Sequence, residues 1–344
     1  SADRGGHRNA AIPITGAGGE VGHGLISALH AAGKRNVVAI DIRALPREHR
    51  ELCLDTFVGD ICDQFLLGRL LAMYEITEIY HLAALLSTRG EFTPETAHEV
   101  NVNGTLNLLR LAAEQARSHG QRVRFNFPSS MAVYGVPTLE AKNKAGKVRE
   151  DQCCEPITMY GCNKLYCEHL GRYYARHYRL LAQDRMPDVL DFRAIRFPGL
   201  ISSETLPSGG TSDYGPEMLH AAAEGKPYTC FVRADTRIPF MTMPDAIDAF
   251  LKLSSADASK LTRNVYNITS FNPSAGEFAD IVKRHFPKAQ ITFEPDEQRQ
   301  QIVDSWAADI DDSAARHDWG YAPRHDLKGA FDEYLVPRIR ARYA

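Results

Sequence analysis

The sequence lacks any long hydrophobic run and any strong excess of charge of one sign. No apolar stretch approaches the roughly 18–20 residues that a membrane-spanning helix needs, so we expect no membrane partner. The formal net charge is only −3, which gives a polyanion little attraction, and nucleic acid is therefore not expected as a partner either. With 344 residues, 44% of them hydrophobic, the chain can bury a full core as one large domain or two fused lobes.

The sequence also lacks a cysteine or histidine pattern that would bind metal. Its seven cysteines are odd in number, and the adjacent pair Cys153 and Cys154 makes a poor disulfide framework, which favours reduced thiols and a cytoplasmic location. The thirteen histidines show no His-x-x-x-His spacing and no clustering with cysteine, so we predict no metal site. We expect His81 to pack at the end of a strand.

What the sequence does contain is a glycine-rich turn near its beginning. The apolar run 10–14 predicts a buried strand, and Gly16, Gly19 and Gly22 follow it. A strand that turns into a helix through glycines presents bare backbone N–H groups at a helix N-terminus, where the helix dipole favours an anion. Gly16 would permit the sharp turn, Gly19 the approach of a diphosphate, and Gly22 close packing of helix and strand.

An acidic residue follows where a dinucleotide-binding turn requires one. Asp41 ends the apolar run 37–40 and lies 19 residues after Gly22. A carboxylate there can accept hydrogen bonds from both ribose hydroxyls of an adenosine. The coincidence of strand, glycines and acid favours a nucleotide site over a simple glycine-rich surface turn.

Strand-like runs alternate with helical patterns through the first half of the chain, which predicts a parallel sheet with helices on both faces. Further strands are expected at 56–60, 78–84 and 123–127, and a helix at 101–119. We expect Asp60 and Ile61 to meet an adenine ring, and the small residues before position 85 to let a cofactor backbone pass closely. The polar stretch 140–155 is interpreted as a solvated loop.

A second motif, Tyr160-Gly-Cys-Asn-Lys164, places a phenol and an ammonium on one face of a predicted helix. An ammonium beside a phenol lowers the pKa of the phenol from about 10, which gives a base usable near neutral pH. Ser130, at the end of a predicted strand, offers a second hydroxyl to the same substrate oxygen. The alternative, a surface pair on an amphipathic helix, is disfavoured by the glycine-rich turn.

Together these motifs resemble those of the extended short-chain dehydrogenase/reductases. They are Thr15-Gly-x-x-Gly-x-x-Gly22, Asp41, His81-Leu-Ala-Ala84, Asn101-Val-Asn-Gly-Thr105, Ser129-Ser-Met-Ala-Val-Tyr-Gly135 and Tyr160-x-x-x-Lys164. The resemblance implies a tightly held NAD cofactor and Ser130, Tyr160 and Lys164 as catalytic residues. The residues that it assigns to the cofactor are Gly16, Gly19, Glu20, Val21, Gly22, Asp41, Ile42, Arg43, Asp60, Ile61, Leu82, Ala83, Ala84, Asn101, Tyr160, Lys164 and Phe197.

The second half of the chain resembles the short-chain type of L-threonine 3-dehydrogenase. The segments that carry this resemblance are 196–203, 205–214, 235–239, 304–306 and 311–320, together with Glu20 and 85–87. It implies oxidation of the secondary hydroxyl of a small β-hydroxy amino acid, L-threonine giving 2-amino-3-oxobutyrate. The substrate-binding residues implied are Ser87, Ser130, Tyr160, Gly199, Thr211 and Trp306, the last with core packing as its alternative role.

Some features depart from that subfamily or fit a rival. Segments 140–155 and 179–188 look longer than in typical threonine dehydrogenases, and Ser208-Gly-Gly210 replaces a triple glycine. Arg237 fits the threonine dehydrogenase pattern, but a nucleotide-sugar epimerase could use an Arg there to bind a substrate phosphate. The alternatives are therefore an NAD-dependent nucleotide-sugar epimerase/dehydratase and, from another class, a catalytically silent NAD(H)-binding regulator.

The expected fold is a Rossmann-type, doubly wound α/β sheet with a smaller C-terminal α/β lobe. We expect residues 8–197, with about 236–268, to form the NAD-binding domain, and residues 198–235 and 269–344 to form the substrate-binding lobe. The resemblance also implies a homodimer, formed through the two long helices that carry the Asn101 and Tyr160 motifs.

Overall fold

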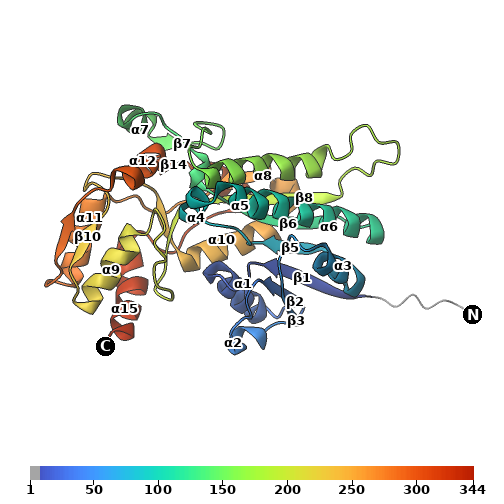
Figure 1. Cartoon of the computed structure of the whole chain (residues 1–344), viewed down its shortest axis with the longest axis horizontal. Helices are drawn as coiled ribbons and strands as arrows, with labels where there is room; N and C mark the ends of the chain where they lie inside the picture. The colour runs from blue at the N-terminus through green and yellow to red at the C-terminus, as the bar shows by residue number, and fades with distance from the viewer. Residues whose placement is uncertain (1–7) are drawn as a thin grey trace, which may run out of the picture. The chain divides into compact units, whose positions relative to one another are not determined.

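The computed structural model describes residues 8–344, and its amino-terminal half alternates strands and helices around a parallel sheet (Figure 1). The strands of the sheet are β1 (Asn9–Thr15), β2 (Val37–Asp41), β3 (Asp55–Val58), β4 (Tyr74–Ile76), β5 (Glu78–His81), β6 (Val123–Ser130), β8 (Leu190–Phe197) and β12 (Val265–Asn267). Their order is β12-β8-β6-β5-β1-β2-β3, with β4 paired to β1. The expected strands are all present, and the predicted α/β fold is confirmed.

The register of the sheet brings the site-bearing strand ends to one edge. Thr15 lies opposite Ile40 of β2 and His81 of β5, and Asp41 lies opposite Val58 of β3. All of these pairings are parallel. The carboxyl ends of β1, β2, β3 and β5 therefore share one edge of the sheet, where open α/β folds bind their ligands.

The helices of this half follow from their apolar faces and end signals. They are α1 (Glu20–Ala31), α2 (Arg47–Arg50), α3 (Gln64–Met73), α4 (Ser87–Phe92), α5 (Pro94–His98), η1 (Glu99–Asn103), α6 (Gly104–His119) and α8 (Met159–Arg176). In α6, Leu108, Leu109 and Ala112 are buried, and the helix ends at Gly120 in the left-handed conformation. The π-helix η1 continues directly into α6, so the predicted helix begins slightly before Asn101.

The chain divides into two compact units that do not follow the sequence order. The first contains residues up to 85, 95–128 and 166–194, and the second contains residues 86–94, 129–165 and 195–344. The functional domain boundaries expected from the sequence stay a prediction. Among residues 8–344, no helix has the length and apolar character that a membrane span requires.

The second unit is built from short strand pairs and helices around an aromatic core. Its strands are β7 (Lys147–Val148), β9 (Gly199–Ile201), β10 (Tyr228–Cys230), β11 (Phe240–Thr242), β13 (Ile291–Phe293) and β14 (Asp309–Ile310), paired β10-β13, β9-β11 and β7-β14. Its helices are η2 (Met131–Val133), α7 (Leu139–Ala145), α9 (Tyr214–Glu224), α10 (Met243–Ser255), η3 (Ala258–Lys260), α11 (Ala275–His285), α12 (Glu297–Ser305), α13 (Ser313–Trp319), α14 (Leu327–Gly329), η4 (Ala330–Leu335) and α15 (Val336–Arg342). Tyr214, Phe240, Phe278 and Phe331 are fully or almost fully buried there.

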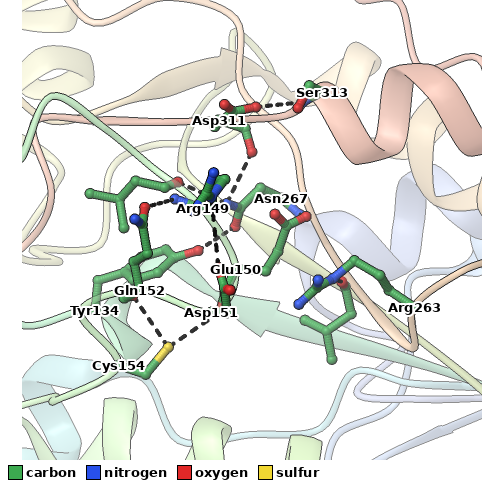
Figure 2. A network of polar contacts seen from close by, with 12 residues as sticks. Tyr134, Arg149, Glu150, Asp151, Gln152, Cys154, Arg263, Asn267, Asp311 and Ser313 are labelled. Carbon is green, nitrogen blue, oxygen red and sulfur yellow. Dashed lines mark hydrogen bonds and ion pairs between the residues drawn. The ribbon is translucent and has the colours of Figure 1, made fainter.

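The expectation of a solvated loop at 140–155 is wrong in part: most of the segment is exposed, but it forms helix α7 and strand β7 and buries Lys142 and Glu150. Helix α7 begins after Thr138, whose Oγ1 accepts a hydrogen bond from the Ala141 N–H at 3.1 Å. Lys142 on this helix is only 3% exposed. Further along, the carboxylate of Glu150 accepts a hydrogen bond from the Asn267 N–H at 3.2 Å, and Tyr134 donates to the Asn267 side chain at 2.7 Å (Figure 2). Two polar residues of the segment, Lys142 and Glu150, thus have a structural role in the interior, whereas the others are mostly exposed.

Candidate active site

The glycine turn between β1 and α1 is shaped by close packing. Gly16 has φ +62°, and a Cβ atom there would lie 2.6 Å from the Ala83 nitrogen. A Cβ atom on Gly22 would lie 2.5 Å from the Ala17 carbonyl oxygen. Gly19 is different, because it is exposed and its nearest neighbour would be 3.5 Å away. It precedes α1 without a side-chain cap, so the first N–H groups of that helix suit an anion such as a diphosphate.

Asp41 is fixed against this turn. Its two carboxylate oxygens accept hydrogen bonds from the Gly18 N–H at 2.9 Å and the Arg43 N–H at 3.0 Å. The carboxylate thus lies at the carboxyl end of β2, beside the glycines, as the ribose assignment requires. Together the turn and this acid fit the adenosine diphosphate half of NAD.

Two apolar side chains stand exposed beside Asp41. Ile42 is 69% exposed and Val58, opposite Asp41 in the register, is 63% exposed, which suits the apolar faces of an adenine ring. Asp60 is exposed and accepts a hydrogen bond from the Cys62 N–H at 2.9 Å, whereas Ile61 is only 4% exposed. Sequence reasoning missed Val58, although its place in the Thr-Phe-Val-Gly-Asp segment could have indicated it.

A buried hydrogen-bond chain ties the glycine turn to the segment after β5. The Ala83 N–H donates to Thr15 Oγ1 at 3.2 Å, and Thr15 Oγ1 lies 2.7 Å from His81 Nδ1. His81 Nε2 lies 2.9 Å from Thr105 Oγ1, which donates to the Asn101 carbonyl at 2.6 Å. Because the Thr105 hydroxyl gives its one proton to the Asn101 carbonyl, this order assigns a proton to His81 Nε2. His81 is therefore a buried strand-end residue, as expected, and it also links the cofactor segments.

Asn101 holds the end of the same segment. It is 3% exposed, and its side-chain amide pairs with the backbone of Leu85, accepting from the N–H at 2.8 Å and donating to the carbonyl at 3.1 Å. It therefore positions residues 82–85. Its direct contact with a cofactor stays a prediction, as do those of the other residues assigned by resemblance.

The predicted catalytic residues come together in the second unit. Ser130 ends β6, and its Oγ accepts a hydrogen bond from the Ala132 N–H at 3.0 Å. Ser130 lies beside the Tyr160 phenol, and its side chain lowers the pKa of that phenol. The Lys164 ammonium lies over the Tyr160 ring, 5.5 Å from its centroid, and its side chain is buried. Two hydroxyls and a cation thus converge as the sequence motif predicts.

Gly161 explains how the Tyr160 helix reaches the Ser130 turn. A Cβ atom at this position would overlap the Ala132 carbonyl oxygen and lie 2.8 Å from the Pro156 Cβ. The Gly161 N–H also donates to Thr158 Oγ1 at 3.0 Å. Sequence reasoning missed this role, because the overlap involves residues remote in the sequence.

The pKa of Tyr160 departs from expectation. Burial raises the pKa of its hydroxyl to about 12, and the interaction with Ser130 acts in the opposite direction. The lowered pKa expected from the Tyr-x-x-x-Lys motif is thus wrong for the protein alone. Burial destabilises the charged phenolate by more free energy than the interaction with Ser130 stabilises it, so the pKa rises.

The remaining predicted substrate residues are placed as follows. Ser87 begins α4, and its Oγ lies 3.4 Å from Thr211 Oγ1. Gly199 lies in β9, where a Cβ atom would meet the Phe240 ring at 2.6 Å. Trp306 is 4% exposed within the core of the second unit, and Phe197 is also buried. Substrate or cofactor contact stays a prediction for each of them.

Two arginines that could bind the diphosphate of a nucleotide sugar already have hydrogen-bond or ion-pair partners within the protein. Arg196 donates to the Tyr134 hydroxyl at 2.9 Å and to the Glu150 carbonyl at 2.7 Å. Arg237 donates to the Asn272 carbonyl at 2.9 Å and is ion-paired with Glu277. Within the described residues, no three His, Cys, Asp or Glu side chains gather as a metal site would require.

Comparison with known proteins agrees with this geometry. Residues 12–269 match the model of the NAD dependent epimerase/dehydratase family. A mitochondrial L-threonine 3-dehydrogenase of Bos taurus is 38% identical over 318 residues, which cover 92% of this chain and 79% of the relative.

Solved structures give the same result. An L-threonine dehydrogenase of Cupriavidus necator is 35% identical with a TM-score of 0.82, covering 97% of this chain and 100% of that one. A monomeric L-threonine 3-dehydrogenase from a metagenome is 34% identical with a TM-score of 0.83, at coverages of 97% and 100%. The chain therefore belongs to the NAD-dependent epimerase/dehydratase family, within the extended short-chain dehydrogenase/reductases, and is an NAD-dependent dehydrogenase.

Proposed function

We propose that the chain oxidises the secondary hydroxyl of L-threonine to give 2-amino-3-oxobutyrate. The observation that carries this proposal is the Lys164 ammonium over the Tyr160 phenol ring, with Ser130 beside the same phenol. The similarity to L-threonine 3-dehydrogenases over most of the chain supports threonine as the substrate.

In this mechanism, residues of the second unit bind the substrate hydroxyl and remove its proton. Ser130 holds the substrate oxygen by a hydrogen bond, and Tyr160 takes the hydroxyl proton as general base. A nearby cation favours the phenolate, and this is the role that the proposal gives to the Lys164 ammonium above the Tyr160 ring. When bound, NAD⁺ supplies the hydride acceptor and the positive charge of its nicotinamide.

The residues of the first unit would hold the cofactor. The N–H groups at the start of α1 suit the diphosphate, and Asp41 suits the adenosine ribose. The assignment of a cofactor domain to residues 8–197 with 236–268, and of a substrate lobe to the rest, belongs to this proposal. Cytoplasmic location and homodimer formation stay predictions, and one similar enzyme is described as monomeric.

The alternatives are less well supported. A nucleotide sugar carries a diphosphate that needs charge-assisted donors, and both Arg196 and Arg237 are already paired. A silent regulator would have no need for the assembled Ser130, Tyr160 and Lys164.

The test is a substrate screen with purified protein and NAD⁺. We expect NADH formation with L-threonine, and no interconversion of UDP-glucose and UDP-galactose. The same screen should include β-hydroxy acids that lack the amino group, which separates threonine from other small alcohols. Epimerisation of a nucleotide sugar without added NAD⁺, and no turnover of threonine, would reject the proposal.

A further inference from the structure

The loop of residues 208–213 connects β9 to α9 and carries Thr211, one of the predicted substrate residues. Thr211 is only 4% exposed, and its hydroxyl lies 3.4 Å from that of Ser87. Gly209 has φ +82°, so the loop turns through a conformation that favours glycine. The position of Thr211 therefore depends on how this loop is held.

The loop is anchored at its end by Asp213. The carboxylate of this residue accepts hydrogen bonds from the Gly210 N–H at 2.8 Å and the Ser208 N–H at 3.2 Å. These bonds fix the N–H side of the loop to the start of α9. The Gly210 carbonyl in turn accepts a hydrogen bond from the Asp213 N–H at 3.0 Å.

Arg299, on helix α12, contacts the loop from outside it. Its Nη2 donates to the carbonyl of Gly209 at 3.1 Å and to that of Gly210 at 3.2 Å. Its guanidinium carbon lies 3.5 Å from the centroid of the Phe231 ring. A planar guanidinium can stack on a ring and donate in its own plane at the same time, whereas an ammonium cannot.

The backbone of Arg299 is also held in place. Its N–H donates to the N-cap carboxylate of Asp296 at 3.1 Å. The next residue, Gln300, accepts from the Arg233 N–H at 2.7 Å and donates to Thr236 Oγ1 at 3.1 Å. The first turn of α12, which carries Arg299, is therefore held by hydrogen bonds of its own.

A second element touches the same carbonyl. Thr88 of α4 donates to the Gly209 carbonyl at 3.4 Å, one residue after the Ser87 that faces Thr211. The loop is thus held between Arg299 and the start of α4, and both contacts meet at Gly209.

We propose that Arg299 is a positioning residue that holds the 208–213 loop and thereby sets the affinity for the substrate. This inference rests on the proposed function, since Thr211 is taken to contact threonine. Loss of the stacked guanidinium should remove the contact between the loop and α12 and raise the KM for threonine about tenfold, which corresponds to about 1.4 kcal/mol. The KM for NAD⁺ should stay unchanged, and kcat should fall less than KM rises.

The experiment compares Arg299→Lys and Arg299→Ala with the matched control Arg340→Lys. Arg340 also stacks on a phenylalanine ring, at 5.1 Å from the Phe286 centroid, and donates to a backbone carbonyl at 2.5 Å, but it does not contact the loop. Hydrogen exchange of residues 205–213 is measured beside the kinetics. We expect faster exchange in that segment and a raised threonine KM in both Arg299 variants, with neither change in Arg340→Lys.

The two readouts separate the possible failures. If wild-type protein leaves threonine untouched, the proposed function fails, and hydrogen exchange still decides whether Arg299 holds the loop. Unchanged exchange in Arg299→Lys overturns the inference, and so does a loosened loop with an unchanged threonine KM. Arg299→Lys keeps the side-chain length and charge, so the test stands even if Arg299→Ala does not fold.

Discussion

Gly161 packs directly against the carbonyl group of Ala132, so that no side chain separates the Tyr160 helix from the Ser130 turn. The contact lies one residue from Tyr160 and two residues from Ser130. Any atom added at Gly161 must push these two segments apart, and with them the side chains of Ser130 and Tyr160. The distance between the two hydroxyls that we propose to be catalytic thus depends on the absence of a Cβ atom at Gly161.

We expect Gly161→Ala to lower kcat for threonine oxidation by about 10²-fold, because misplacement of reacting groups by about 1 Å can cost that much. Cofactor binding, measured by NAD⁺ titration, should be largely retained. The control is Gly68→Ala in α3, where a Cβ atom meets nothing within 4 Å, so activity should be unchanged and stability slightly increased. Wild-type turnover in Gly161→Ala would contradict this prediction.

The Tyr160 hydroxyl gives a pH prediction. With its pKa raised to about 12 by burial, the phenolate is a minor species at neutral pH, and its share grows as pH rises. Threonine oxidation should therefore increase from about pH 7 to pH 9, and Tyr160→Phe should lower turnover by about 10²–10⁴-fold. Because the substrate amino group titrates too, the quantity to measure is the ratio of wild-type to Tyr160→Phe rates. A ratio that is constant across this range would argue against Tyr160 as the base.

Local patterns in the sequence were sufficient for the fold and the glycine turn. The strands ending at Thr15 and Asp41 contain continuous apolar runs, as buried parallel strands require. The glycines between β1 and α1 could be recognised from their local position between a strand and a helix, although Gly16 also packs against the distant Ala83. These elements were therefore predictable residue by residue.

Features that depend on long-range packing were not predictable. The pKa of Tyr160 depends on its burial, and the role of Gly161 depends on the Ala132 carbonyl. The spacing of Tyr160 and Lys164 predicts that they share a helix face, but it carries no information on desolvation. The burial of Lys142 in α7 could not be predicted either, because its partner, Val303, lies 161 positions away.

Asp41 gives a prediction on cofactor choice. Its carboxylate is fixed by the Gly18 and Arg43 N–H groups and would face the 2′-phosphate of NADP⁺ as a like charge. We expect kcat/KM to favour NAD⁺ over NADP⁺, and Asp41→Ser to reduce that preference, mainly through a higher KM for NAD⁺. Ile42→Ser, at the adjacent exposed position, is the control that should weaken both cofactors alike. Comparable kcat/KM for the two cofactors in the wild type would show that Asp41 is not at the ribose.

Lys142 is a buried cation whose ammonium donates to the Val303 carbonyl at 3.0 Å. Burial lowers its pKa from 10.5 to about 8, although the nearby Asp304 carboxylate opposes this shift. Below pH 8 the lysine is charged in both the folded and the unfolded protein, so the folded state carries the full cost of burial. Between pH 8 and 10.5 only the folded state loses the proton, so wild-type stability should rise with pH in this window.

Replacing this ammonium by an apolar group should therefore stabilise the protein, and the gain should depend on pH. For Lys142→Met we expect a gain of up to about 3 kcal/mol near pH 7, since one pKa unit corresponds to about 1.4 kcal/mol, and little gain above pH 10. Urea denaturation of both proteins at these two pH values measures it. Lys144→Met, at an exposed position of the same helix, should show no such pH-dependent difference. A Lys142→Met variant that is less stable than the wild type at pH 7 would mean that the bond to the Val303 carbonyl outweighs the cost of burying the charge.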